Sequence, residues 1–121
     1  MTNVTVCAKR RWNDTKLDLR EGDPVRITAS GAWTDWTIPT DPGGFEKPHL
    51  AWLRWTRRCR DARWFELVAV IGKSDGPYHR IGREGRFTAD RSGRLYLFAN
   101  DAWIMYWNNK GAIEAEVTLE T

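Results

Sequence analysis

The chain has 121 residues, a formal net charge of +3 and a sequence pI near 9.1, with 41% hydrophobic and 29% charged residues. This length fits a single domain, residues 1–121, and the apolar content is too high for a disordered chain. No apolar run approaches the roughly 20 residues of a membrane-spanning helix, so we expect no membrane span. The N-terminus lacks a hydrophobic signal core, which predicts a cytoplasmic protein or one exported without a conventional signal peptide.

Alternation of apolar and polar residues with a period of two dominates the chain and predicts strands. The predicted strands are residues 2–8, 16–19, 25–30, 64–72, 86–89, 94–99 and 111–120. Gly31 is expected to close the third of them. The run 64–72 is almost continuously apolar, which is typical of a central strand covered on both faces. Seven or eight short strands separated by turn signals predict an all-β sandwich or barrel.

Two long connections interrupt this pattern. Residues 34–48 are rich in proline and glycine, so we expect no regular element there. Residues 49–63 have room for one or two helical turns but show no stable amphipathic face. Loops of this length in a small domain are usually functional or mobile.

Tryptophan and arginine are distributed unusually. Eight tryptophans exceed what one small core easily hides, so either the interior is very aromatic or some rings face a ligand or partner. Residues 52–64 interleave three of these tryptophans with five arginines. This segment is open to three interpretations: a surface for anions, a solvated loop anchored by its rings, or an oligomer interface. We expect no nucleic-acid partner, because the net charge is small.

Catalytic patterns are missing from the sequence. The only two histidines, His49 and His79, have no metal-site spacing, and a zinc site joining them to Cys7 and Cys59 has no local signature. No glycine-rich phosphate loop is present, and the carboxylates are scattered. We therefore expect a protein that is not an enzyme. The two cysteines are expected as free thiols, although one bridge between them is conceivable.

The segment 100–111 carries oxygen ligands at short spacing: Asn100, Asp101, Asn108 and Asn109. Calcium binds about six to eight oxygens from carboxylates, amides and backbone carbonyls, so such a loop is able to wrap this ion. Asparagine and glycine also form ordinary turns, so spacing alone leaves both interpretations open.

These residues belong to a wider pattern. Gly22-Asp23 precedes a strand, Ala29-Ser30-Gly31 precedes a tryptophan, and Asn100-Asp101 is followed seven residues later by Asn108-Asn109. In this order the chain resembles the LecA-type (PA-IL-like) bacterial calcium-dependent galactose lectins, which share a galactose-binding-like jelly roll. The resemblance covers most of the chain and is weak over residues 37–62. It implies a small jelly-roll β-sandwich of two antiparallel sheets.

The resemblance also implies a calcium ion that bridges to two sugar hydroxyls at one end of the sandwich. Asp101, Asn108 and Asn109 would be side-chain ligands, and Met105 would supply a backbone oxygen. A further backbone oxygen would come from Asp35, or from Trp36 if the register differs by one.

The loop 102–107 departs from the family, whose corresponding residues are small. Here it is bulky and apolar, so it either stacks on a sugar or blocks the site. The residues predicted to contact the ligand are Trp36, His49, Asn100, Trp103 and Trp107. The leading hypothesis is a calcium-dependent binder of galactose or another glycan, working as a homo-oligomer because one such site is weak. The alternative is a structural or assembly domain whose aromatic loops form an interface without binding sugar.

Overall fold

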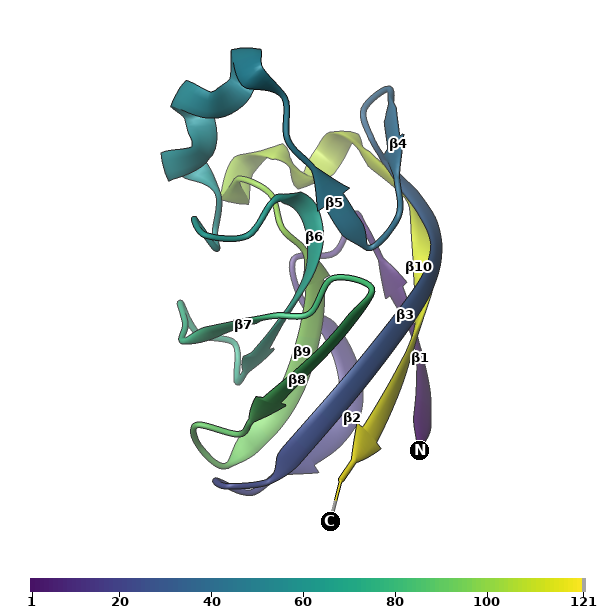
Figure 1. Ribbon diagram of the computed structural model, residues 1–121, viewed down its shortest axis with the longest axis vertical. Coiled ribbons are helices and arrows are strands. Elements are labelled where there is room, and N and C mark those ends of the chain that lie inside the picture. The colour runs from purple at the N-terminus through teal and green to yellow at the C-terminus, as the bar shows by residue number, and fades with distance from the viewer. Residues whose placement is uncertain (121) are drawn as a thin grey trace.

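The structure is a computed structural model that describes residues 1–120 apart from the side chain of Leu50. Two antiparallel sheets of five strands each pack face to face (Figure 1), which confirms the all-β jelly-roll sandwich. The first sheet has the order β1 (Thr2–Cys7), β10 (Asn109–Leu119), β3 (Pro24–Asp35) and β4 (Ile38–Thr40), with β8 (Glu84–Thr88) also paired to β3. The second has the order β2 (Asn13–Leu19), β9 (Gly93–Ala99), β6 (Trp64–Ile71) and β5 (Gly43–Phe45), with β7 (Tyr78–Arg80) also paired to β6.

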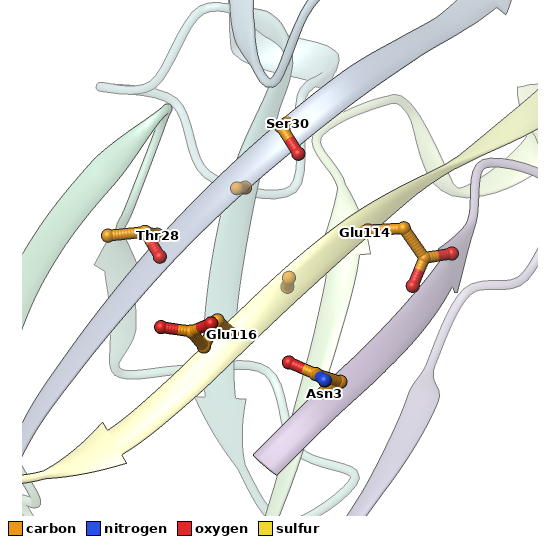
Figure 2. A pocket seen from close by; sticks show the side chains of 7 residues that line it. Asn3, Thr28, Ser30, Glu114 and Glu116 are labelled. Carbon is orange, nitrogen blue, oxygen red and sulfur yellow. The ribbon is translucent and has the colours of Figure 1, made fainter. Parts of the chain in front are cut away.

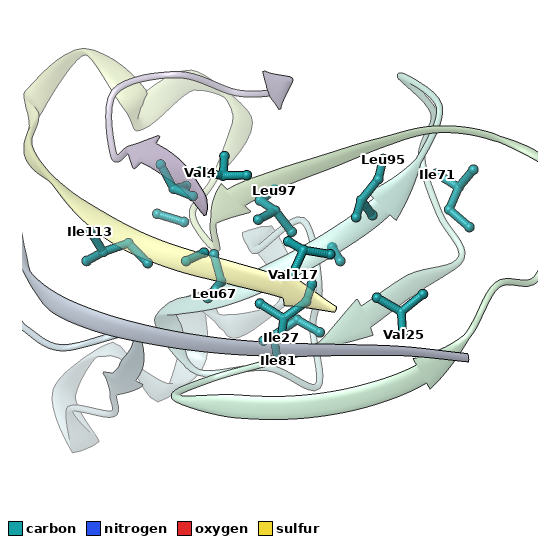
Figure 3. Packing of buried hydrophobic residues seen from close by; sticks show 14 of the residues in the cluster. Val4, Val25, Ile27, Leu67, Ile71, Ile81, Leu95, Leu97, Ile113 and Val117 are labelled. Atoms are coloured by element: carbon teal, nitrogen blue, oxygen red, sulfur yellow. The ribbon is translucent and has the colours of Figure 1, made fainter. Parts of the chain in front are cut away.

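The main core lies between the two sheets and follows from alternation along the strands. On β10, Ile113, Ala115 and Val117 are buried, while Glu114 projects from the outer face and is exposed. Val25 and Ile27 on β3 pack beside them, and side chains of the second sheet complete the core (Figure 3). Burial of these apolar side chains is the main source of stability.

Strand β6 is buried along its whole length, as its continuous apolar run predicted. Its odd-numbered residues from Phe65 to Ile71 join the main core. Val68 and Val70 point to the opposite face, where they form a second cluster with Phe98, Cys59 and Ala62. The segment after residue 56 therefore acts as a cover for the outer face of β6.

Several expectations for the middle of the chain are wrong. Strand β3 does not end at Gly31, whose positive φ of 108° lets the strand continue opposite Ile113 as far as Asp35. The stretch 34–48, expected to be irregular, contributes β4 and β5, each only three residues long. Strand β7 was not predicted. These short strands exist because longer neighbours supply their hydrogen bonds, a non-local cause that no sequence window contains.

Two short 3₁₀ helices complete the fold: η1 (Pro48–Thr56) and η2 (Trp103–Asn108). The helical turns expected in residues 49–63 correspond to η1. Both helices, β4 and β5 gather at one end of the sandwich, and both chain termini lie toward the other end (Figure 1). No helix in the described residues has the length and apolarity to cross a membrane. Cys7 and Cys59 are unpaired.

Candidate functional site

A cleft of about 730 Å³ opens at the end of the sandwich that carries η1 and η2. Three segments far apart in the sequence meet there: the β3–β4 turn, η1 with its return to β6, and the segment that contains η2. The lining residues are Asp35, Trp36, Ile38, His49, Leu53, Trp55, Thr56, Arg60, Trp64, Asp101, Ala102, Trp103, Ile104, Met105 and Asn108. The cleft is therefore mostly apolar, with a few polar groups from β3 and the η2 segment.

The 3₁₀ geometry of η2 explains how a bulky apolar hexapeptide borders an open cleft. A 3₁₀ helix has three residues per turn, so positions three apart share a face. Tyr106 is 1% exposed and anchors the turn, because its hydroxyl donates to the Ala99 carbonyl oxygen at 2.6 Å. Trp107 does not line the cleft and is 69% exposed, and Ile104 lines the cleft although it is 77% exposed. The loop therefore forms one wall of the cleft without filling it.

Three predicted metal ligands, Asp101, Asn108 and Asn109, each hold a buried oxygen without a hydrogen-bond partner. Asp101 is 3% exposed, and only its Oδ1 is bonded, to the Ala102 amide at 2.7 Å. Asn109 donates through Nδ2 to the Ala8 carbonyl oxygen at 3.0 Å, which leaves its Oδ1 free. Within residues 1–120, these are the only side-chain oxygens in that condition. Leaving each one unpaired costs about 1–3 kcal/mol, so the arrangement requires an explanation.

Asp35 brings a second carboxylate to the same place. The inward row of β3 runs from buried Trp33 to Asp35, which lies directly opposite Asn109 in the β3–β10 register. Burial raises the pKa of Asp35. Burial and, secondarily, the charge of Asp35 raise the pKa of Asp101 to about 7. Neither carboxylate forms a salt bridge within the described part of the chain.

Trp36 forms the corner between β3 and β4 and has strained backbone geometry. Its φ is +54°, a conformation that bulky L-residues rarely adopt. Its amide donates to the Asn108 carbonyl oxygen at 3.2 Å, which ties this corner to the end of η2. The side chain is 66% exposed at the rim of the cleft. Strain of this kind often accompanies a functional site, because another requirement holds the backbone in place.

Arg58 holds η2 in place through contacts with two residues of that helix, Trp103 and Tyr106. Its guanidinium lies 3.4 Å from the Phe98 ring centroid and 3.9 Å from that of Trp103, and Nη1 donates to the Tyr106 hydroxyl at 2.8 Å. The Nε and Nη2 atoms are buried and unpaired. Cation–π contacts of a desolvated arginine contribute about 2 kcal/mol or more.

The interpretation of the arginine-rich segment as a solvated loop is therefore wrong for two of its arginines. Arg57 and Arg58 are 4% and 7% exposed and point inward. An anion-binding surface built on all five arginines is also excluded, because these two are used within the protein.

The predicted site residues divide into two groups. The structure brings Asp35, Trp36, His49, Asp101, Trp103, Met105 and Asn108 to the cleft, and it places Asn109 beneath them. Asn100 and Trp107 were expected to contact the ligand and do not line the cleft. Asn100 is fully buried and uses its amide to hold residues 59–63, with Oδ1 accepting from the Cys59 amide at 2.9 Å. Trp107 faces solvent because of the three-residue period of η2.

Sequence reasoning did not predict the opposite wall of the cleft, which is formed by Leu53, Trp55, Arg60 and Trp64. The one signal was the density of tryptophan in this stretch. Trp33, two residues before Asp35, is 1% exposed and belongs to the main core. Within residues 1–120, no three His, Cys, Asp or Glu side chains are grouped to hold a metal.

A second hollow of about 370 Å³ lies on the first sheet, across β1, β3 and β10 (Figure 2). Its side chains include Asn3, Thr28 and Glu114, and Glu114 already accepts a hydrogen bond from Thr5 at 2.8 Å. None of its lining residues has a buried polar side-chain atom without a partner. The cleft is therefore the stronger candidate.

Comparisons with known proteins bear on the fold. No family model matches the chain, and no curated protein matches it. Among solved structures the chain is similar to one described as "EclA N-terminal domain; PllA-like lectin", with 24% sequence identity and a TM-score of 0.73. The alignment covers 99% of this chain and 97% of that one. Practically the whole chain therefore shares the fold of a lectin domain.

Proposed function

We propose that this chain is a calcium-dependent carbohydrate-binding domain whose cleft holds the ion and the sugar together. The observation that carries the proposal is the set of three buried, unpaired oxygens on Asp101, Asn108 and Asn109. Carboxylate and amide oxygens are the ligands that calcium prefers. A cation bound there would satisfy all three and remove the cost of burying them unpaired.

Charge supports the same conclusion. Asp35 and Asp101 place two carboxylates at one end of the cleft, and their raised pKa values reflect burial without a compensating cation. A divalent cation would balance both charges. The Met105 carbonyl and a carbonyl at Asp35 or Trp36 would add neutral ligands.

Calcium, when bound, supplies coordination positions that two sugar hydroxyls are able to fill. The chain's own residues then orient the sugar. Trp36 and Trp103 line the cleft, where their aromatic rings would pack against the apolar C–H face of a pyranose, and His49 adds a polar lining group. The lectin domain with the same fold adds support, and the proposed activity is binding without catalysis.

Calorimetry tests this proposal. Protein freed of metal with EDTA is titrated with calcium, and then with methyl glycosides of galactose, glucose, mannose, fucose and N-acetylglucosamine. We expect calcium binding and a calcium-dependent heat with at least one sugar. Asp101→Asn should abolish both, whereas Asp18→Asn, which changes a carboxylate with a 71% exposed side chain on β2, should preserve them. Absence of calcium binding, or of any calcium-dependent sugar binding, would refute the proposal.

A second candidate function is that of an assembly domain, and one observation favours it. Most of the exposed large apolar residues belong to the cleft end of the molecule: Trp36, Trp52, Trp55, Ile104 and Trp107. Large exposed apolar patches often mark protein interfaces. This alternative predicts an oligomer in sedimentation velocity whose tryptophan fluorescence resists acrylamide quenching and does not respond to calcium or sugar.

A further inference from the structure

Large apolar side chains at the cleft end of the molecule are exposed to solvent, and this exposed surface extends beyond the cleft. The side chains that form this surface, which we call the apolar rim, are between 63% and 77% exposed and belong to Trp36, Trp52, Trp55, Ile104 and Trp107. They come from the β3–β4 turn, η1 and η2, which lie together at one end of the sandwich (Figure 1). Trp52 and Trp107 do not line the cleft, so binding of a ligand in the cleft leaves these two rings without a role.

Exposed cations accompany the apolar rim. The run 47–60, which includes η1, contains no acidic residue. The exposed cations of this run and of the residues after η2 are Lys47, Arg54, Arg60 and Lys110. None of them forms a salt bridge within residues 1–120. Of the two acidic residues that flank the run, Glu46 pairs with the buried Arg57, and Asp61 is exposed. The surface around the rim therefore carries an excess of positive charge.

Exposed tryptophans surrounded by lysine and arginine are typical of proteins that bind at the surface of a bilayer. A tryptophan ring is amphipathic and sits at the level of the lipid headgroups, at the edge of the hydrocarbon. Binding of this kind grows with the apolar area that enters the interface and with the attraction between basic side chains and anionic lipids. The apolar rim and its cations supply both contributions at the same end of the molecule.

A second copy of the chain fits this surface less well. Most homodimers are two-fold symmetric, so the rim of one copy would face the same rim on the other. Such a contact would bring the unpaired cations of both copies together, and like charges that face each other across an interface oppose binding. The cleft, which Trp36, Trp55 and Ile104 help to line, would also remain as a void in that contact. An anionic lipid surface is fluid and has the complementary charge, so it avoids both costs.

We infer that the apolar rim docks on the surface of a bilayer that contains anionic phospholipid. Trp52, Trp55 and Trp107 enter the headgroup region, and the exposed cations around them contact lipid phosphates. This contact requires neither calcium nor a sugar, so it is independent of the proposed function.

Binding of the full chain to sedimented vesicles in EDTA tests this inference, because calcium is then unable to bridge the protein to phosphate. The vesicles contain phosphatidylcholine alone or an equimolar mixture of phosphatidylcholine and phosphatidylglycerol, and neither contains a glycolipid. We expect binding to the mixed vesicles that weakens in about 1 M salt, where the Debye length is only about 3 Å. Phospholipids with brominated acyl chains should quench part of the tryptophan fluorescence, because the rings of the rim lie close to those chains.

Trp52→Ala and Trp107→Ala should each weaken binding to the mixed vesicles about tenfold, because each removes an exposed ring. Leu119→Ala is the matched control, since Leu119 is an exposed apolar residue at the opposite end of the sandwich. Arg54→Gln should weaken binding about fivefold, whereas Arg20→Gln, in the turn between β2 and β3 at the opposite end, should leave it unchanged. None of these residues lines the cleft, so calcium and sugar binding should not change in any of the variants.

Absence of binding to the mixed vesicles would overturn the inference, whatever the calorimetry of calcium and sugar shows. Unchanged vesicle binding in both tryptophan variants would also overturn it, because a basic protein would then be adsorbed by charge alone. Sedimentation velocity without lipid detects the competing occupant: an oligomer that Trp52→Ala or Trp107→Ala dissociates would assign the rim to self-association instead. Vesicle binding without any calcium or sugar binding would refute the proposed function and leave this inference standing.

Discussion

Replacing Asp101 with asparagine should stabilise the metal-free protein at neutral pH while destroying the proposed calcium site. The substitution keeps the shape of the side chain and retains an oxygen to accept the Ala102 amide, now bonded at 2.7 Å. It removes a buried negative charge that the metal-free fold leaves uncompensated. It also provides an amide donor beside the unpaired oxygens of Asn108 and Asn109.

The magnitude follows from linkage between ionisation and folding. The pKa of Asp101 rises from 3.8 to about 7, mainly through burial, and each pKa unit corresponds to about 1.4 kcal/mol. Because the folded pKa is raised, the folded state binds more protons than the unfolded state between these values. The contribution of Asp101 is therefore fully present below pH 3.8 and is lost as the pH rises through 7, to a total of about 4 kcal/mol. Asp35, whose pKa is also raised by burial, acts in the same direction.

Urea unfolding in EDTA, followed by tryptophan fluorescence at a series of pH values, measures this effect. The free energy of unfolding of Asp101→Asn minus that of the wild type should grow by several kcal/mol between pH 4 and pH 7.5 and then level off. Calcium at a hundredfold excess over its Kd should stabilise only the wild type, by about 2.7 kcal/mol. Parallel pH profiles for the two proteins would refute the reasoning, because they would mean that the Asp101 carboxylate ionises as easily in the folded protein as in the unfolded chain.

Three further predictions concern the scaffold around the cleft, each measured as a change in the free energy of unfolding. Arg58→Met should be neutral or stabilising, whereas Arg58→Ala should cost about 3 kcal/mol, because both substitutions remove the buried charge but only methionine refills the space between the Phe98 and Trp103 rings. Asn100→Ala should cost about 3 kcal/mol, because it would leave backbone groups of residues 59–63 without their hydrogen-bond partners. Gly44→Ala should cost at least about 2 kcal/mol, because its Cβ would clash with the Trp64 carbonyl oxygen. Gly72→Ala, at a similar φ but with open space around the Cβ, should cost about 1 kcal/mol.

The parts of the fold that sequence reasoning predicted are those whose cause is local. Strand β10 alternates cleanly, and β6 is apolar throughout because both of its faces are covered, so each strand can be read from a short window. Strands β4 and β5 have three residues each and exist only through pairing with β3 and β6. Prolines and glycines in that stretch suggested irregular structure, whereas Gly44 is required there because its φ is +75° and the Trp64 backbone lies too close for a side chain.

In the candidate site too, sequence reasoning predicted the parts with a local cause and missed those that depend on distant contacts. Asp101 and Asn108 lie at the two ends of one short segment, so that their closeness follows from the local sequence, although their spacing alone left a metal site and an ordinary turn both open. The wall that contains Trp55 could not be predicted, because it depends on Arg57 and Arg58 turning inward against aromatic rings. Arginine side chains are mostly exposed in proteins, so the sequence alone predicts that they lie at the surface. Only tertiary packing reverses that expectation.

At the cleft end of the molecule, the charge of a buried arginine and the charges of the buried acidic pair are compensated differently. Arg58 is buried without a carboxylate partner, and its charge is stabilised by aromatic faces and by the Arg11 carbonyl oxygen at 2.6 Å. Asp35 and Asp101 have no comparable compensation from the chain. An arginine paired with Asp101 would relieve that cost and would occupy the oxygens that a cation needs. Arg58 instead contacts Trp103 and Tyr106 and thereby holds η2 in place. The carboxylates of Asp35 and Asp101 stay free of an arginine partner. The uncompensated charges of Asp35 and Asp101 therefore destabilise the metal-free protein, and calcium binding would remove this cost.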